Sequence, residues 1–174
     1  MSRLLVVVDM QNDFVDGALG FEGADGIVSG IVKRIDEYKA SGDEVVYTLD
    51  THFDNYSGTQ EGKNLPVPHC IKGTEGHKLV PALQDVLSDC RSFEKPSFGS
   101  MELAAYIRDN ADRYDSIEFC GLVSNICVLS NAVIAKAAAP EAEIIVDSSL
   151  TDSFDKKLND EVFDILKGIQ ITVV

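Results

Sequence analysis

Leu4-Leu-Val-Val-Val8 is an unbroken apolar run, and Asp9 follows it directly. A short apolar run rich in β-branched residues is typical of a strand that is buried on both faces, as in the middle of a parallel sheet. In such sheets ligands bind at the carboxyl ends of the strands, where the connecting loops converge. The run therefore predicts a central parallel strand, with the Asp9 carboxylate at the edge of the sheet where a site would lie.

Similar short runs alternate with longer amphipathic segments along the rest of the chain. The other predicted strands are residues 44–49, 91–94, 116–120, 143–146 and 169–174, and the pattern is weakest at 91–94. The predicted helices are residues 27–40, 78–87, 101–110, 126–138 and 158–167. This alternation predicts an α/β fold with helices on both faces of a parallel sheet. We expect residues 1–174 to form one domain.

Composition excludes several classes of function. The 174 residues are 45% apolar and 25% charged, as in ordinary soluble proteins, and no apolar run reaches the roughly 18 residues of a membrane span. The formal net charge of -14 opposes binding to nucleic acid or to an anionic membrane. The four cysteines show no paired spacing and the start shows no signal peptide, so we expect a cytoplasmic protein. Composition leaves a homo-oligomer open.

A cysteine lies where a predicted strand gives way to a predicted helix, in Gly121-Leu-Val-Ser-Asn-Ile-Cys127. Ser124 or Asn125 could cap the helix, which would place Cys127 in its first turn, where unpaired N–H groups and the helix dipole stabilise a thiolate. A cysteine among apolar neighbours is also often a small core residue. Cys127 is therefore a candidate nucleophile that needs a base and a cation beside it.

Two charged residues at other strand ends could supply that base and cation. Asp9 follows the central strand, where burial would raise its pKa toward that of a useful base, although it could instead cap the loop around Asn12 and Asp13. Lys95 ends the 91–94 run at the same edge, although most lysines are solvated surface charges. Together with Cys127 they form a coherent set, in which the carboxylate takes the thiol proton and the ammonium holds the negative charges together.

The irregular stretch 51–77 contains all three histidines of the chain, which favours a functional loop. In Asp50-Thr-His52 alternate residues of an extended chain point the same way and could bind one cation. His69 could complete a site for zinc, iron or manganese. Glu61 is a further candidate ligand or else a solvated loop charge. His77 is expected at the surface, and Cys70 is expected to turn into the protein.

Asp9-Met-Gln-Asn-Asp-Phe14, Lys95 and Gly121-Leu-Val-Ser-Asn-Ile-Cys127-Val resemble the isochorismatase-like cysteine hydrolases over nearly the whole chain. The resemblance implies a three-layer α/β/α fold with a six-stranded parallel sheet, and catalysis by Asp9, Lys95 and Cys127. It also implies a cis peptide between Leu122 and Val123, which turns the Val123 amide toward an oxyanion that the Cys127 amide also meets. Phe14 and Val123 would contact the substrate.

Within that family, Asp50-Thr-His52 and Pro66-Val-Pro-His69-Cys-Ile-Lys-Gly-Thr-Glu-Gly76 look like the metal-binding signature of nicotinamidases. The resemblance implies one divalent ion, zinc first and iron or manganese as alternatives, held by Asp50, His52 and His69 with Glu61 as a fourth ligand. The implied reaction is hydrolysis of nicotinamide, and of pyrazinamide, through a Cys127 thioester.

The chain departs from the nicotinamidase pattern at two places on the pocket wall. It contains no tryptophan, where many nicotinamidases have one shortly before the third metal ligand, and Pro66 stands near that place. The segment Ser124-Asn-Ile126 also differs from the common version. Two rival hypotheses stay open: a family amidase that acts on a carbamoyl or ureido substrate, and a catalytically silent binding protein of the same fold.

Overall fold

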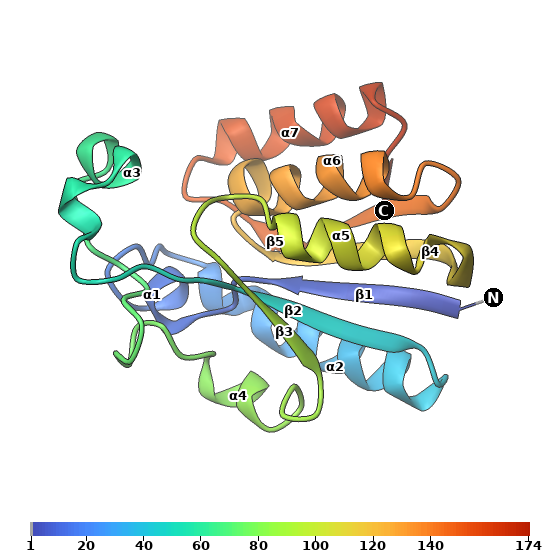
Figure 1. Ribbon diagram of the computed structural model, residues 1–174, viewed down its shortest axis with the longest axis horizontal. Helices are drawn as coiled ribbons and strands as arrows, with labels where there is room; N and C mark the ends of the chain where they lie inside the picture. The colour runs from blue at the N-terminus through green and yellow to red at the C-terminus, as the bar shows by residue number, and fades with distance from the viewer. Residues whose placement is uncertain (1) are drawn as a thin grey trace.

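The computed structural model describes residues 2–174, and its framework is a six-stranded, all-parallel sheet (Figure 1). The order β3-β2-β1-β4-β5-β6 places the first strand in the interior of the sheet, as the Leu4 to Val8 run predicts. All six predicted strands are present, including the weakest one. Their bounds are β1 Ser2–Val8, β2 Glu44–Asp50, β3 Arg91–Lys95, β4 Tyr114–Leu122, β5 Glu143–Asp152 and β6 Thr172–Val173.

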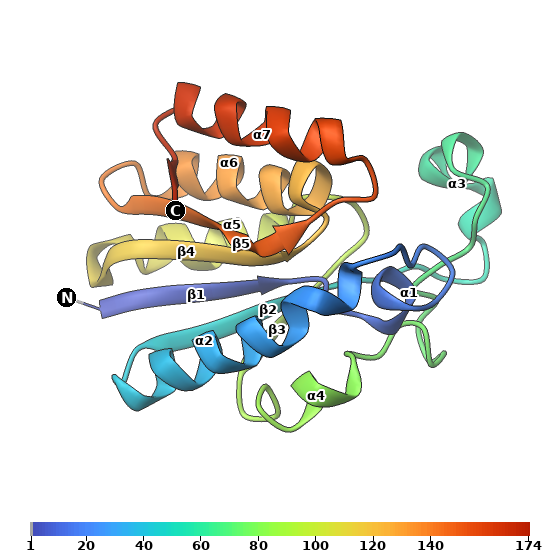
Figure 2. The same ribbon diagram turned by 180° about the vertical axis from the view of Figure 1, so that it is seen from behind.

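Helices cover both faces of this sheet, so the fold has the predicted three layers (Figures 1 and 2). Helices α2 (Val28–Ala40) and α4 (Pro81–Gln84) lie on one face. On the other face lie α5 (Met101–Asp109), α6 (Leu129–Ala138) and α7 (Lys156–Gly168). The short helices α1 (Asn12–Val15) and α3 (Gln60–Asn64) and the turns η1 (Ala24–Ile27), η2 (Tyr56–Gly58) and η3 (Ala111–Arg113) belong to the connecting loops.

Alternate residues of β1 serve two separate cores. Leu4, Val6 and Val8 pack into the core beneath α5, α6 and α7, whereas Leu5 and Val7 pack into the core beneath α2 and α4. All five side chains are fully buried, so the helical layers on both faces remove the apolar surface of this strand from water. In residues 2–174 no helix has the length and apolar character that crossing a membrane requires.

The largest difference from the sequence-based prediction concerns residues 78–87, of which only Pro81–Gln84 are helical. The residues before Pro81 pair with the loop that follows β1: Leu79 forms an antiparallel bridge with Gln11, and the Val80 amide donates to the Met10 carbonyl. These tertiary hydrogen bonds hold residues 78–80 extended. The predicted strand 169–174 also shortens to β6, because Gln170, at φ 65°, lies in the turn that ends α7.

The order of the strands reverses direction between β1 and β4, and the loops that follow these strands diverge to opposite faces of the sheet. Asp9, at φ 47°, turns the chain sharply out of β1. Gly121, at φ 110°, bends the end of β4 beside it, and a Cβ built on Gly121 would lie 2.1 Å from the Val8 carbonyl oxygen. Only glycine allows the two strand ends to approach this closely.

Gly121→Ala is expected to lower the free energy of unfolding by about 2 to 3 kcal/mol, because the new methyl group meets the backbone of β1 and the left-handed φ is strained. Gly42→Ala is the matched control, since Gly42 also has a positive φ of 74° but a Cβ there meets nothing within 4 Å. Urea denaturation should show a loss of only about 1 kcal/mol for that control. Equal losses of unfolding free energy in both variants would show that the close approach of β4 to β1 does not make Gly121 necessary.

Candidate active site

The Asp9 carboxylate and the Lys95 ammonium form a buried ion pair at the carboxyl ends of β1 and β3. The Lys95 Nζ lies 2.7 Å from Asp9 Oδ2, and both side chains are fully buried. Thr48, on the intervening strand β2, donates its hydroxyl to Asp9 Oδ1 at 2.6 Å. Asp9 Oδ2 is held by the Lys95 ammonium, and among residues 2–174 it has no further hydrogen-bond partner. It is therefore the carboxylate oxygen that remains for a proton from a third group.

Burial controls the protonation of this pair. It raises the pKa of Asp9, as the sequence predicts, and the nearby Lys95 ammonium opposes the rise without cancelling it. For Lys95, burial lowers the pKa, but electrostatic interactions with Asp9, Cys127 and Asp50 outweigh burial and leave the pKa above its ordinary value. Lys95 therefore stays a cation, and Asp9 is a stronger base than an exposed carboxylate.

Cys127 faces the same ion pair from the turn that follows β4. Its Sγ lies 3.5 Å from Lys95 Nζ, and the residue is 4% exposed. The turn η4 (Ser124–Val128) is a π-helical turn that leads into α6, so the predicted helix 126–138 begins with wider winding. The Val128 amide accordingly donates to the Val123 carbonyl, five residues earlier. The peptide between Leu122 and Val123 is cis.

The expected helix cap is wrong. Val123 is the residue that precedes the turn, and no side chain caps it. The Ser124 hydroxyl instead donates to Asn159 Oδ1 at 2.7 Å, and Asn125 Oδ1 accepts from the Ser153 hydroxyl at 2.7 Å. Both side chains are therefore engaged by the segment that follows β5 and by α7, which tie the cysteine-bearing turn to the neighbouring strand.

The expectation of a thiolate stabilised by the helix is also wrong for the resting protein. Burial raises the pKa of the Cys127 thiol well above its ordinary value, the Asp9 charge raises it further, and Lys95 only partly compensates. The resting state is thus a neutral thiol beside a carboxylate and an ammonium. Formation of the thiolate requires transfer of its proton to a neighbouring base.

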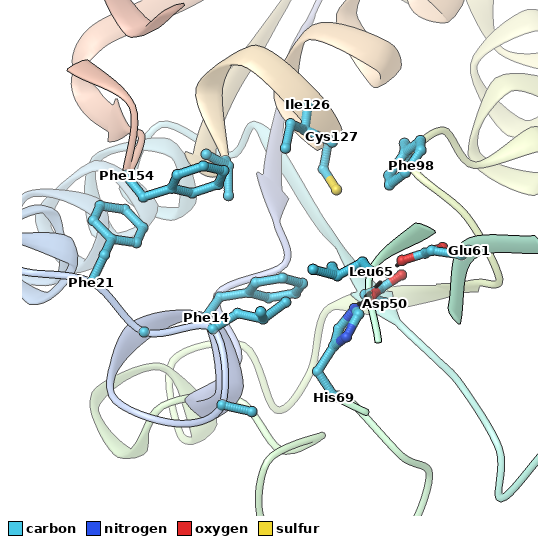
Figure 3. A pocket seen from close by; sticks show the side chains of 14 residues that line it. Phe14, Phe21, Asp50, Glu61, Leu65, His69, Phe98, Ile126, Cys127 and Phe154 are labelled. Atoms are coloured by element: carbon cyan, nitrogen blue, oxygen red, sulfur yellow. Dashed lines mark ion pairs between the residues drawn. The ribbon is translucent and has the colours of Figure 1, made fainter. Parts of the chain in front are cut away.

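A second cluster lies beside the first and consists of two imidazoles and two carboxylates. Figure 3 shows three of its four members, Asp50, Glu61 and His69. His52 Nε2 and His69 Nε2 lie 3.0 and 3.3 Å from Asp50 Oδ2, and each lies 3.6 Å from Glu61 Oε1. Asp50 ends β2, His52 follows it, and the loop brings Glu61 on α3 and His69 back to them. The structure thus brings together all four residues that the sequence predicts as ligands.

The donor set fits a zinc ion. The four histidine-to-carboxylate distances are short enough for ligands that each lie about 2.0 to 2.2 Å from one zinc ion, and all four ligand atoms lie within 4.8 Å of one another. His69 Nδ1 donates to the Val67 carbonyl at 2.8 Å, which leaves the Nε2 lone pair facing the cluster. Burial favours neutral Asp50, but the two imidazoles and Lys95 outweigh it and lower the pKa of Asp50, so this ligand is ionised.

Asp50 connects the two clusters, because its Oδ1 lies 3.4 Å from Lys95 Nζ while its Oδ2 faces the imidazoles. Gln11 fixes this strand end: its side-chain amide accepts from the Asp50 amide at 2.8 Å and donates to the Asp50 carbonyl at 2.9 Å. A single sequence does not reveal residues whose role is to hydrogen-bond to a site residue and hold it in place. The sequence analysis therefore did not identify Gln11 and Thr48, although both lie near predicted strand ends.

Two other residues of the loop lie outside the ligand cluster. Cys70 is fully buried, as expected. His77 was expected at the surface, but it is half-buried and its Nε2 lies 2.9 Å from the Thr51 hydroxyl. The extended pairing of residues 78–80 with the β1 loop holds His77 against the end of β2, which explains this difference.

A cavity of about 380 Å³ joins Cys127 to the ligand cluster, and its walls are mainly aromatic and aliphatic (Figure 3). Phe14 lines it and packs edge-on against His69, at 5.7 Å between ring centres, and Val123 also lines it. The sequence analysis missed most of the remaining wall, because isolated aromatic residues in loops carry no pattern. The missed residues are Leu19, Phe21, Leu65, Phe98 and Phe154.

Residues 3–174 match the family model described as the isochorismatase domain. The chain is 26% identical over 171 residues to the nicotinamidase/pyrazinamidase of Mycobacterium tuberculosis, which covers 88% of this chain and 89% of the relative. A pyrazinamidase of Pyrococcus horikoshii, solved in complex with zinc, superimposes with a TM-score of 0.86 at 25% identity, over 100% of this chain and 99% of that one.

An N-carbamoylsarcosine amidase from Thermoplasma acidophilum superimposes with a TM-score of 0.80 at 26% identity, over 99% of this chain and 95% of that one. These two solved structures are of enzymes named for different substrates, and both share the fold of this chain. The fold alone therefore does not identify the substrate. The match over almost the whole chain, together with the sheet order and the site, shows that this protein belongs to the isochorismatase domain family of hydrolases.

Proposed function

We propose that this protein is a metal-dependent amidase that converts nicotinamide to nicotinate and ammonia. The observation that carries the proposal is one apolar cavity with Cys127 on one wall and three members of the ligand cluster, Asp50, Glu61 and His69, on another. The M. tuberculosis relative and the zinc-bound P. horikoshii structure support it, since their names describe nicotinamidase and pyrazinamidase activities.

The four-residue cluster would hold one divalent ion, with zinc favoured and iron or manganese as alternatives. When bound, the ion would supply a ligand position for the pyridine nitrogen and so orient the amide carbonyl. Phe14, which lines the cavity beside His69, would pack against the pyridine ring.

Acylation would begin with proton transfer from the Cys127 thiol to Asp9 Oδ2, the oxygen that also pairs with Lys95. Cys127 Sγ then attacks the amide carbon, and the Val123 and Cys127 amides would stabilise the oxyanion. As the intermediate collapses, the C–N bond breaks and Asp9 gives its proton to the departing ammonia. Lys95 stays charged throughout, so it offsets the negative charge that moves between Asp9 and Cys127.

Hydrolysis of the thioester would reuse the same groups. Asp9 accepts a proton from water, whose oxygen attacks the acyl carbon and displaces Cys127. The thiolate then recovers its proton from Asp9, because burial strongly favours the neutral thiol. Asp9 therefore acts as base and acid once in each half of the reaction.

The charges of the cavity oppose the rival substrate that carries a carboxylate. In the described residues 2–174, no arginine or lysine side chain lines the cavity, whereas Asp50 and Glu61 do. The substrate of an N-carbamoylsarcosine amidase carries a carboxylate, which would find no arginine or lysine side chain to pair with there. An uncharged aromatic amide can pack against the aromatic wall and has no carboxylate that needs a cationic partner.

An ammonia-release assay over a panel of amides tests the proposal. Nicotinamide and pyrazinamide should be hydrolysed, with kcat/KM at least about 100-fold above that for N-carbamoylsarcosine. Ammonia from the ureido compound alone, at a rate independent of bound metal, would favour the rival amidase. Release of ammonia from none of these amides would favour the silent binding protein.

Asp9→Asn should slow acylation by roughly 100-fold to 10,000-fold, because the amide keeps the shape of the side chain but cannot accept the thiol proton. Single-turnover release of ammonia from nicotinamide measures this step directly. Thr48→Val is the control, since it removes only the hydroxyl bound to Asp9 Oδ1 and should cost much less. An Asp9→Asn protein that acylates as fast as the parent would exclude Asp9 as the base.

A further inference from the structure

Asn131 lies one helical turn after Cys127, on α6, and its side chain is almost completely buried. Its Nδ2 donates to the Cys127 carbonyl at 2.8 Å and to the Phe98 carbonyl at 3.0 Å, and its Oδ1 accepts from the Ser100 amide at 3.0 Å. Because Nδ2 must face the two carbonyls and Oδ1 must face the N–H group, the side-chain amide of Asn131 has a single orientation. A buried side chain thus joins the cysteine-bearing turn to the loop between β3 and α5.

That loop also controls the Lys95 ammonium. Lys95 ends β3, and its Nζ donates to the Ser97 carbonyl at 3.0 Å and to Cys127 Sγ at 3.5 Å. The loop packs closely on α6, since a Cβ built on Gly99 would lie 2.4 Å from the Ile134 side chain. Asn131 bonds to residues on both sides of Gly99, so it fixes the part of the loop that aims Lys95.

From these contacts we infer that Asn131 is a positioning residue, which holds Cys127 and the Lys95 loop at the spacing that the thiol needs for ionisation. This inference rests on the proposed role of Cys127 as the nucleophile. Asn131 touches neither the cavity nor the ligand cluster, so its effect should appear in the reactivity of Cys127 rather than in metal binding. Small displacements of a reacting group far from the substituted residue can cost about 100-fold in rate.

Three variants separate positioning from stability. Asn131→Ala removes all three hydrogen bonds. Asn131→Ser keeps a hydroxyl that can reach the Cys127 carbonyl of its own helix but is too short to bridge to Phe98 and Ser100. Ala135→Gly is the matched control, because Ala135 is equally buried on α6 and glycine weakens the helix without touching the loop.

Two readouts are required for each variant as purified with its metal. The first is the rate of iodoacetamide alkylation at Cys127, followed by peptide mapping so that any alkylation of the half-exposed Cys90 is counted separately. The second is kcat and KM for nicotinamide. Asn131→Ala and Asn131→Ser should both alkylate about 10-fold more slowly and lose about 10-fold to 100-fold in kcat, with KM and metal content unchanged. Ala135→Gly should lower the melting temperature by a similar amount and leave both rates at the parent level.

Asn131 variants that melt earlier but keep the parent alkylation rate and kcat would overturn the inference, because the residue would then serve stability alone. If Asn131→Ala does not fold, Asn131→Ser decides by the same criteria. Alkylation needs no amide substrate. A protein that fails to hydrolyse nicotinamide but whose Asn131 variants still alkylate slowly would therefore refute the proposed function and retain the positioning role.

Discussion

Cys127→Ala is expected to abolish the proposed hydrolysis of nicotinamide, while the protein should stay folded and still bind nicotinamide. The expected loss is at least about 10,000-fold, because the proposed mechanism has no second nucleophile and the acyl group has nowhere else to go. The thiol occupies a small volume next to Lys95 and Asp9, and its removal leaves that ion pair in place. Ammonia release measures activity, and calorimetric titration with nicotinamide measures binding.

Cys120→Ala is the matched control, because Cys120 is also buried, lies on the neighbouring strand β4, and makes the same change of volume. It should keep its activity and lose about 1 kcal/mol of stability, as should Cys70→Ala and Cys90→Ala. Turnover by Cys127→Ala at a rate near that of the parent would refute the thioester mechanism altogether.

His69→Ala is expected to lose the bound metal and, with it, the hydrolysis of nicotinamide. Its Nε2 faces Asp50 and Glu61, and its Nδ1 is fixed by the Val67 carbonyl, so no neighbouring side chain can take its place in the cluster. Removal of one of four ligands should weaken metal affinity by far more than the roughly 10-fold to 100-fold that is typical when a residue that only hydrogen-bonds to a ligand is removed. Elemental analysis after dialysis against a weak chelator gives the stoichiometry.

The control is His77→Ala, since His77 belongs to the same loop but binds Thr51 rather than the cluster. It should retain one metal ion per chain and parent activity. Full occupancy in His69→Ala would show that the ligand set is wrong, and would move the proposal toward an amidase of this fold that works without a metal.

The predicted strands were recovered because fully buried parallel strands carry a strong local signal. The Leu4 to Val8 run identifies β1, and the short β-branched runs identify its neighbours. Since parallel strands place their carboxyl ends at one edge, the residues that follow them meet in space, as Asp9, Asp50 and Lys95 do. This part of the site follows from topology alone.

The features that the sequence did not predict depend on tertiary contacts, which leave no local pattern in the sequence. Residues 78–80 follow the backbone of the β1 loop rather than their helical spacing, and Ser124 bonds to Asn159 rather than capping its own turn. The sequence also predicts a lowered pKa for Cys127 from the helix dipole. Burial reverses that direction, because desolvation of a thiolate outweighs a helix end and one nearby cation.

The central claim is that nicotinamide is hydrolysed through an acyl group on Cys127, and hydroxylamine tests it most directly. A thioester partitions between water and hydroxylamine, so the parent protein should form nicotinohydroxamate at the expense of nicotinate while ammonia release stays the same or rises. The Cys127→Ala protein should form neither product. Ammonia and nicotinate produced in equal amounts, with no hydroxamate above the uncatalysed background, would contradict the account.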